Sequence, residues 1–157
     1  MANRYTQLYT QLVFAVHSPK NRIKPEWNKE LQSYLTGITN NLKCKMLAIN
    51  NMPDHLHAFV SRHPAVAEAE LIQKLKNNSS RWINTNNWFK HKFSWQTGYG
   101  AFSYSHSQRE RVCKYIANQQ NHHRKMTFRE EYIQFLKIFG IDFNENYLFD
   151  FYDEIGD

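Results

Sequence analysis

The sequence predicts an α+β fold, a ferredoxin-like βαββαβ antiparallel sheet that is followed by extra C-terminal helices. Three observations carry this prediction. Short segments of alternating apolar and polar residues indicate strands, longer segments with apolar residues at helical spacing indicate helices between them, and two capping signals indicate further helices near the C-terminus. With 157 residues, of which 41% are hydrophobic and 15% aromatic, the chain has enough apolar material for one folded domain over residues 1–157.

The first half of the chain predicts a strand, a helix and a two-stranded hairpin. Residues 5–17 alternate between apolar and polar side chains for much of their length, as a half-buried strand does. Pro25 stands where a helix can begin, and apolar residues at helical spacing continue to Leu42. Residues 44–49 and 55–61 then read as two strands that are joined by a turn and pair with each other.

The next segment completes the βαββαβ order. Residues 68–84 have the spacing of a second helix, and residues 94–104 read as a fourth strand that is loosened by Gly98 and Gly100. Because crossover connections between strands are right-handed, this order places both helices on one face of the sheet. We therefore expect the other face to stay open for a functional site.

Two capping boxes predict the C-terminal helices. A capping box pairs a Ser or Thr with a Glu or Gln three residues later, at the start of a helix. Ser107 with Glu110 predicts the start of a third helix, and Thr127 with Glu130 predicts a last helix that ends at Gly140. The acidic, aromatic tail that follows is expected to pack on the body of the protein or on a partner subunit.

Charge is distributed unevenly along the chain. Residues 141–157 hold six acidic residues and no Lys or Arg, so the preceding 140 residues hold 20 basic and 8 acidic residues, a net charge of +12. A body this basic is typical of proteins that bind a polyanion, although a merely solvated surface would have the same composition.

The sequence gives no sign of membrane insertion or secretion. No apolar run approaches the roughly 18 residues of a membrane span, and no charged-then-apolar leader opens the chain. Cys44 and Cys113 have no metal-ligand spacing and are expected to be reduced thiols. We expect a cytoplasmic protein with no membrane partner.

Four residues in two segments predict a metal site beside a nucleophile. His55 and His57 stand two apart in a predicted strand, so both imidazoles point to one face. Tyr115 and Gln119 stand four apart in a predicted helix, where residues at that spacing are neighbours. If the two faces meet, two imidazole nitrogens and an amide oxygen lie beside a phenol. Each residue alone is weak evidence, and the combination indicates the site.

These residue types suit chemistry on a phosphate group. Neutral imidazoles and an amide oxygen leave a bound divalent cation its full Lewis acidity. A phenol has a reference pKa of about 10 and seldom attacks anything unaided. A cation that polarises the phosphorus, together with a phenol held in line with it, removes this obstacle.

The same residues carry a resemblance to a known family. His55-Leu56-His57 matches the HUH motif, in which two histidines flank a hydrophobic residue, and Tyr115 with Gln119 fits the pattern Tyr-x-x-x-Gln. Together they resemble the small single-tyrosine, TnpA-type transposases of bacterial insertion sequences, which belong to the HUH endonuclease superfamily. The likeness extends over nearly the whole chain, and no catalytic position is broken.

The resemblance implies an enzyme that cuts and rejoins single-stranded DNA at hairpin-bearing ends. Tyr115 would attack a phosphate, forming a 5′-phosphotyrosine bond and releasing a 3′-hydroxyl. The cation, Mg²⁺ or Mn²⁺, would be held by His55, His57 and Gln119. Relatives of this type are dimers in which the tyrosine helix of one subunit can meet the HUH strand of the other. We therefore expect a homodimer whose active site can be composite, and the sequence leaves open whether assembly is in cis or in trans.

Further residues are candidates for supporting roles. Asp54 could orient an imidazole or serve as a turn residue, and His122, seven residues after Tyr115, could contact the metal or a phosphate. The candidate DNA-binding residues, each of which could equally be a solvated surface cation, are Lys74, Lys76, Arg81, Lys90, Lys92 and Arg111.

Two alternative functions stay open at this point. The βαββαβ order also suits RNA-recognition modules, whose sheet aromatics stack on bases, but a non-catalytic binder needs none of the four site residues. In the second alternative, the protein has the same DNA-cleavage chemistry but a different biological role, either as a host-retained enzyme that processes palindromes or as a replication-type nickase. The sequence leaves open the hairpin, the cleavage site, the metal used in the cell and whether this copy is mobile.

Overall fold

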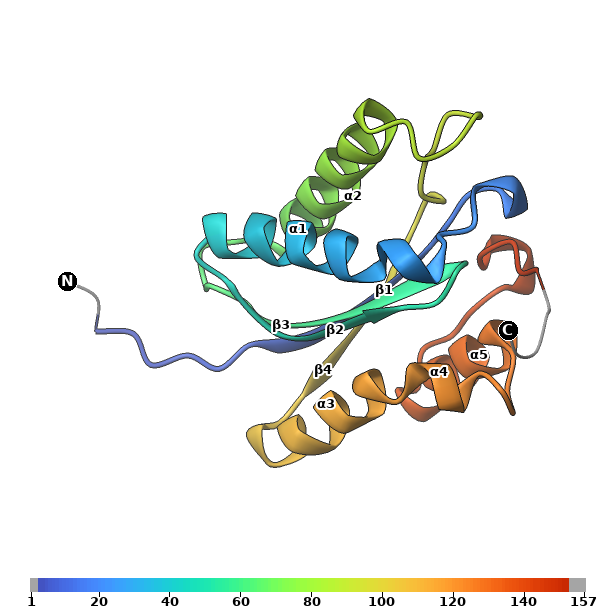
Figure 1. The fold of residues 1–157 in the computed structure, drawn as a ribbon. Helices are drawn as coiled ribbons and strands as arrows, with labels where there is room; N and C mark the ends of the chain where they lie inside the picture. The colour runs from blue at the N-terminus through green and yellow to red at the C-terminus, as the bar shows by residue number, and fades with distance from the viewer. Residues whose placement is uncertain (1–2, 153–157) are drawn as a thin grey trace.

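Four strands form one antiparallel sheet in the computed structural model, which describes residues 3–152 (Figure 1). Their bounds are Tyr9–Ala15 for β1, Lys45–Asn51 for β2, His55–Ser61 for β3 and Gly100–Tyr104 for β4. Along the sheet they lie in the order β2-β3-β1-β4, and each neighbouring pair runs antiparallel. The ferredoxin-like α+β fold that the sequence predicts is therefore confirmed.

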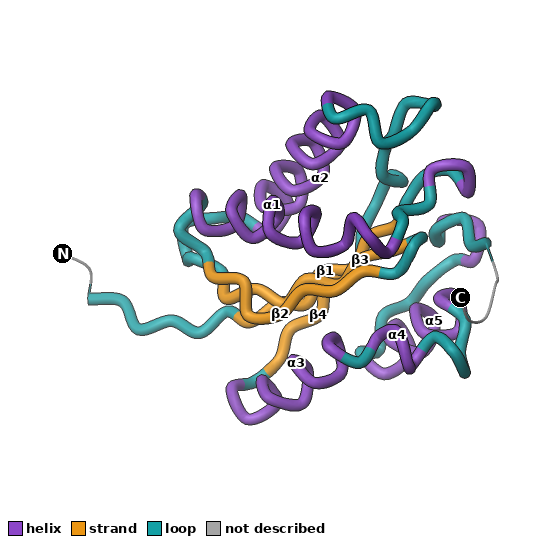
Figure 2. The backbone as a smooth tube through the Cα atoms, viewed as in Figure 1, coloured by secondary structure: helices purple, strands orange, loops and turns teal. Residues whose placement is uncertain are grey.

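Within the described residues, five α-helices cover the sheet on both faces. They are α1 (Asn28–Asn41), α2 (Glu68–Thr85), α3 (Arg109–Ala117), α4 (Gln119–His122) and α5 (Phe128–Ile138). Helices α1 and α2 lie on one face as predicted, and the three C-terminal helices lie on the other (Figures 1 and 2). The expectation of an open second face is wrong, because α3 and α5 pack their apolar sides on it. None of these five helices is both long and apolar enough to cross a membrane.

Alternation along β1 supplies side chains to both layers. Leu12 and Phe14 belong to the core beneath α1 and α2, whereas Val13 and Ala15 belong to the cluster that includes α5. Each of these four residues is at most 1% exposed. The predicted half-buried strand is thus buried on both faces, because the C-terminal helices cover the side that the sequence pattern left without a partner.

Strand β4 is shorter than predicted. Only residues 100–104 join the sheet, and the preceding segment meets the end of β1 through one bridge between Val16 and Trp95. A Cβ atom at Gly100 would lie 2.7 Å from the ring of Tyr132. Helix α5 therefore packs directly on the backbone of β4, which only a glycine permits at this position.

One of the two predicted capping boxes lies at a different place. Ser105 and Gln108 form the box around a short 3₁₀ turn, His106–Gln108, which leads directly into α3, so the predicted pairing of Ser107 with Glu110 is wrong. The second box is confirmed, since Thr127 caps the first turn of α5. Side-chain caps thus mark the start of α5 and of the 3₁₀ turn that leads into α3.

The segment after α5 folds back onto its own chain. Gly140 ends α5 with a φ of 66°, as the sequence predicts for a glycine stop. Phe149 is buried against the rings of Phe128 and Tyr132. Of the two partners expected for the tail, its own body is the one observed here; residues 153–157 of the predicted tail lie outside the described residues.

Lys76 fastens α2 to the segment that precedes β4. Its ammonium group donates hydrogen bonds to the carbonyl oxygens of Gln96, at 2.9 Å, and of Gly98, and it lies 5.8 Å from the ring centre of Phe14. Burial lowers the pKa of Lys76 to about 8. Among the predicted DNA contacts, this side chain is therefore engaged within the protein, whereas Lys74 on the same helix is exposed.

Replacing Lys76 with Ala should lower the free energy of unfolding by about 1–3 kcal/mol, because hydrogen bonds from a charged donor to backbone carbonyls are lost. The matched control Lys74→Ala should change it by less than about 0.5 kcal/mol. Urea unfolding followed by circular dichroism measures both values. Equally small effects of the two substitutions would show that Lys76 does not hold this segment.

Candidate metal centre and tyrosine site

The two histidines of β3 are buried and point toward the C-terminal helices. Nδ1 of His55 lies 2.7 Å from Oδ1 of Asp54, and Nδ1 of His57 lies 2.8 Å from Oε1 of Gln11. Since both partners are acceptors, each ring donates a hydrogen bond from Nδ1 and turns Nε2 toward the interior of the site. A hydrogen bond at the distal nitrogen is how metal-binding imidazoles are commonly oriented. The structure thus gives Asp54 the orienting contact that the sequence suggested.

Gln119 reaches the same place from the junction of α3 and α4. The helix is interrupted at Asn118, so Tyr115 and Gln119 lie on either side of a break rather than on one continuous helix. The side chain of Gln119 is fully buried, with its Oε1 atom 3.3 Å from Nε2 of His55. The predicted meeting of the strand histidines with Gln119 is therefore present in the fold.

Two further residues, His123 and Glu131, complete the cluster and were missed in the sequence. The ligand atoms of His55, His57, His123 and Glu131 all lie within 4.8 Å of one another, and all four residues are buried. Oε1 of Glu131 is 3.1 Å from Nε2 of His57 and 3.1 Å from Nε2 of His123. Nε2 of His123 is also 3.0 Å from Oε1 of Gln119. Three imidazoles, an amide and a carboxylate thus converge on one point.

The sequence contains a signal for each missed residue. His123 follows Gln119 by four positions, the spacing of neighbours on a helix. Glu131 lies between Phe128 and Phe135 on the apolar side of α5, where a carboxylate is unexpected and therefore informative. Neither signal says that α5 folds back over β3, and that contact is what makes the two residues part of the site.

Burial and charge set the protonation of the cluster. Burial by itself would lower the pKa of His55, but the carboxylates of Asp54 and Glu131 raise it to about 9. Burial prevails at His57 and lowers its pKa. Burial would raise the pKa of Glu131, yet the surrounding imidazoles hold it well below its ordinary range. The carboxylate is therefore ionised, and a cation has a negative partner here that the predicted neutral ligand set lacks.

Tyr115 lies at the edge of this cluster. Its hydroxyl donates a hydrogen bond to Oε2 of Glu131 and lies 3.2 Å from Nε2 of His122. Burial and the neighbouring Glu131 carboxylate raise the pKa of the phenol above its ordinary value. The hydroxyl is therefore protonated and held at the cluster. The structure places His122 against this hydroxyl and 3.5 Å from Glu131.

Asn50 holds the end of the tyrosine helix against the sheet. Its amide nitrogen donates to the carbonyl oxygen of Ile116 at 2.9 Å and to Oε1 of Gln120 at 2.8 Å. Asn50 belongs to β2 and is 9% exposed, so its polar atoms depend on these partners. Tyr115 is therefore positioned next to the histidines of its own chain by a fixed contact between β2 and α3.

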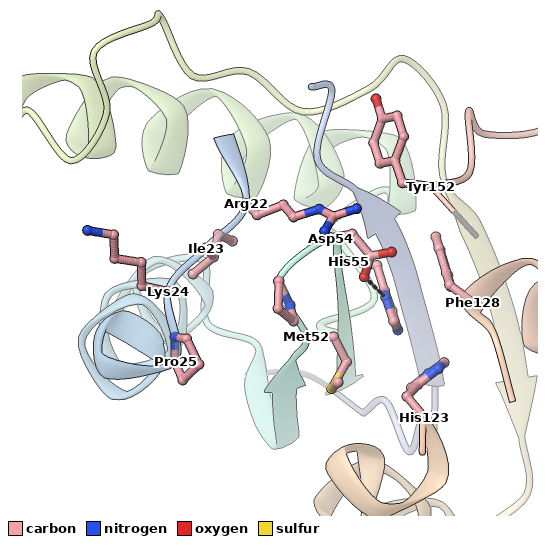
Figure 3. A pocket seen from close by; sticks show the side chains of 11 residues that line it. Arg22, Ile23, Lys24, Pro25, Met52, Asp54, His55, His123, Phe128 and Tyr152 are labelled. Atoms are coloured by element: carbon pink, nitrogen blue, oxygen red, sulfur yellow. Dashed lines mark hydrogen bonds and ion pairs between the residues drawn. The ribbon is translucent and has the colours of Figure 1, made fainter. Parts of the chain in front are cut away.

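Two cavities reach the cluster. The His55 cavity has a volume of about 380 Å³, and its lining includes Arg22, Lys24, His55, His123 and Tyr152 (Figure 3). The Tyr115 cavity has a volume of about 500 Å³, and its lining includes Tyr104, Arg111, Tyr115, Glu131 and Phe135. They have no lining residue in common, so the cluster can be approached from two separate openings.

The predicted DNA-binding residues are dispersed. Arg111 lines the Tyr115 cavity, next to the phenol. Lys74, Lys76 and Arg81 belong to α2, on the opposite face of the sheet from the cluster (Figure 1). Lys90 and Lys92 are exposed in the segment that follows α2. Of the six, only Arg111 is brought to the candidate site.

The donor set fits a divalent metal ion. Imidazole nitrogens and carboxylate or amide oxygens are ligands for divalent metals of the Mn²⁺ to Zn²⁺ series. A buried carboxylate amid three imidazoles is a costly arrangement for a purely structural purpose, and a cation between them would satisfy it. The residues that would hold the ion are His55, His57, Gln119, His123 and Glu131.

Substituting Glu131 with Gln should weaken Mn²⁺ binding by about tenfold or more, because the only carboxylate in the cluster is lost. The matched control is Glu130→Gln, one position away and exposed, where Gln can keep the capping contact with Thr127. Isothermal titration calorimetry measures the affinity of each protein, with thermal unfolding as a check that both are folded. Equal Mn²⁺ affinity in the two variants would exclude Glu131 as a ligand.

Comparison with known proteins places the chain in a family. The family described as "Transposase IS200 like" matches residues 4–119, which is most of the chain. No curated protein matches it. Among solved structures, a Deinococcus radiodurans protein described as a candidate transposase is 21% identical, with a TM-score of 0.59, and the match covers 76% of this chain and 95% of that one. A REP-associated tyrosine transposase, solved bound to a REP hairpin, is 10% identical, with a TM-score of 0.59 and coverage of 78% and 73%.

The two structures share the fold, and the family match shows more than the fold. It spans the strand histidines, the tyrosine and the glutamine, and it ends before His123 and Glu131. The protein is a DNA transposase that belongs to the IS200-like family.

Proposed function

We propose that this transposase cuts and rejoins single-stranded DNA through a covalent 5′-phosphotyrosine intermediate. One observation carries the proposal: the hydroxyl of Tyr115 is held by Glu131 at a buried cluster that fits a divalent metal ion. A phenol beside such a site is suited to attack an electrophile that the metal polarises. In a transposase, the electrophile at hand is the phosphodiester of DNA.

The proposed reaction is a transesterification. The phenolic oxygen of Tyr115 forms a bond to phosphorus, and the bond from phosphorus to the 3′-oxygen of the preceding nucleotide breaks. The proton lost by the phenol is balanced by the one gained by the 3′-oxygen. Because the number of ester bonds is unchanged, a 3′-hydroxyl from another strand can reverse the step without ATP.

The residues of the cluster have separate tasks in this proposal. His55, His57 and Gln119 would hold Mg²⁺ or Mn²⁺, with His123 and Glu131 as further ligands. When bound, the cation supplies Lewis acidity at the scissile phosphate. The Glu131 carboxylate also accepts the hydrogen bond of the attacking hydroxyl and so aims it at the site.

The proposed substrate is a single strand whose ends carry hairpins. The net charge of +12 on residues 1–140 favours a polyanion. The REP hairpin bound to one of the structurally similar proteins supports this class of substrate, and it keeps open the alternative of a host-retained enzyme that processes repeated palindromes. The DNA that flanks the gene distinguishes the two, because a mobile element is bounded by its own palindromic ends.

The first test of this function is cleavage of single strands that carry the flanking palindromes. Cleavage should require Mn²⁺ or Mg²⁺, stop with EDTA and be absent on the same sequence as a plain duplex, because the proposed site needs a cation and an unpaired strand. A labelled-DNA gel measures all three conditions. Cleavage that persists in EDTA, or that prefers duplex, would contradict the proposal.

A second test removes the nucleophile alone. Tyr115→Phe lacks only the hydroxyl, so the protein should still fold and bind DNA, while the covalent protein–DNA adduct on a denaturing gel disappears. Tyr104→Phe is the control, since that ring lines the same cavity but its hydroxyl contacts Gln11 rather than Glu131. An adduct that survives in Tyr115→Phe would assign the attack to another residue.

A third test concerns the proposed homodimer and where its sites are assembled. Tyr115 contacts the cluster of its own chain, which supports assembly in cis. Heterodimers of Tyr115→Phe with His57→Ala should then be inactive, because each site has one defect. Heterodimers of wild type with the double variant should keep one intact site.

Assembly in trans reverses both results, so the pair of heterodimers decides between the two arrangements. Two different affinity tags allow each heterodimer to be isolated before the cleavage assay. If no heterodimer can be isolated from co-expressed chains, the proposed homodimer is wrong.

A further inference from the structure

The two cavities at the cluster differ in which reacting group they reach. The Tyr115 cavity contains the attacking phenol and the Glu131 carboxylate. The His55 cavity contains neither, and it meets the cluster through His55 and His123. A scissile phosphate at the cluster would therefore have the nucleophile on one side and the His55 cavity on another.

In-line displacement assigns the strand to these openings. The attacking and leaving oxygens lie on roughly opposite sides of the phosphorus in phosphoryl transfer. With Tyr115 attacking from its own cavity, the departing 3′-oxygen, and the nucleotide attached to it, extend away from that cavity. The other cavity that meets the cluster is the His55 cavity, which shares no lining residue with the Tyr115 cavity, and we assign the departing nucleotide to it.

The walls of the His55 cavity suit a nucleotide. Figure 3 shows Tyr152 and Phe128 on one side of it and Lys24 on the opposite side. The ring of Phe128 is stacked on the imidazole of His55, with centroids 3.8 Å apart, so a base would meet its edge. The hydroxyl of Tyr152 donates a hydrogen bond to the carbonyl oxygen of His17, and its ring lines the cavity, where it can serve as a wall for stacking.

Charge and size fit the same occupant. Arg22, Lys24 and Asp54 line the cavity; the Asp54 carboxylate is paired with His55, and the Lys24 ammonium lies 5.0 Å from the ring centre of Trp27. The two cations would attract the phosphate on the far side of the bound nucleotide. A volume of about 380 Å³ is at the small end of ligand sites, enough for one nucleotide rather than a duplex. A purely apolar ligand would not need the two cations.

We propose that the His55 cavity binds the nucleotide on the 5′ side of the scissile phosphate, the one that leaves with the free 3′-hydroxyl. In the step above, the bond from Tyr115 to phosphorus forms while the bond to the 3′-oxygen of this nucleotide breaks. The cavity then keeps that hydroxyl near the phosphotyrosine, so it also binds the 3′ end that attacks when strands are rejoined. This inference rests on the proposed function, which it deepens.

Photo-crosslinking tests the assignment directly. Wild-type protein first defines the cleavage point on single strands that carry the flanking palindromes. Two such strands, with 5-iodouracil immediately 5′ or immediately 3′ of that point, are then irradiated on full-length Tyr115→Phe protein. The 5′ base should crosslink to the lining of the His55 cavity, at residues 22–25, 52–55 or 152, as identified by mass spectrometry. The 3′ base should not crosslink there.

Binding of the cleaved strand gives a second readout. A fluorescent single strand that ends in the 3′-hydroxyl should bind Tyr152→Ala about fivefold or more weakly, because one base loses its stacking partner, and Tyr152→Phe should restore binding. Lys24→Ala should also weaken it. Lys29→Ala is the control, since Lys29 is an exposed lysine nearby that does not line the cavity.

The outcomes separate this inference from the proposed function. Suppose that wild type cleaves the strand. The placement of the nucleotide is then wrong if the 5′ base crosslinks to the Tyr115 cavity, or if Tyr152→Ala binds the cleaved strand as tightly as wild type does; the proposed function is unaffected by either result. If wild type forms no covalent adduct on any of these strands, the function and the inference fall together.

Discussion

A single buried carboxylate holds the candidate site together. Glu131 contacts imidazoles from β3 and from the end of α4, the amide of Gln119 and the hydroxyl of Tyr115. A buried charge is tolerated only when it is paired, and breaking such a pairing is strongly unfavourable. If the C-terminal helices moved away from β3, the Glu131 carboxylate and the two histidines of β3 would lose each other as partners. The contact that closes the second layer of the fold is the same one that assembles the site.

The register of β3 decides on which face of the sheet the two histidines lie, and so links the site to the rest of the sheet. His55 and His57 face the C-terminal helices, while Leu56 and Ala58 belong to the core beneath α1 and α2. A shift of one residue would turn both histidines into that apolar core. Pairing on both sides, with β1 and β2, prevents the shift. Asn50 of β2 extends the same framework to the tyrosine helix, so the sheet positions both halves of the site.

Features that depend on residues close together in the sequence could be predicted, and features that depend on long-range contacts could not. The strand from 55 to 61 and the neighbouring positions of Tyr115 and Gln119 depend on short-range periodicity, and they are present in the structure. The expected open face is wrong because α3 and α5 fold onto it, and the capping pair at Ser107 is wrong because the box forms two residues earlier, at Ser105. The predicted ligand set does not include the Glu131 carboxylate, because its place beside the histidines depends on where α5 folds. Periodicity says which side of α5 is apolar, but it does not say which surface of the sheet that side covers. Glu131 and His123 become ligand candidates only through that long-range contact.

The central claim is that the Glu131 cluster binds a divalent cation beside Tyr115. Anomalous diffraction from crystals of the full chain grown with Mn²⁺ measures this most directly, since the manganese signal locates the ion without assumptions about its ligands. The account predicts one peak within coordination distance of Nε2 of His55 and His57 and of the Glu131 carboxylate. A manganese peak elsewhere, with the hydrogen bonds of Glu131 to the histidines intact and the cluster empty, would contradict it.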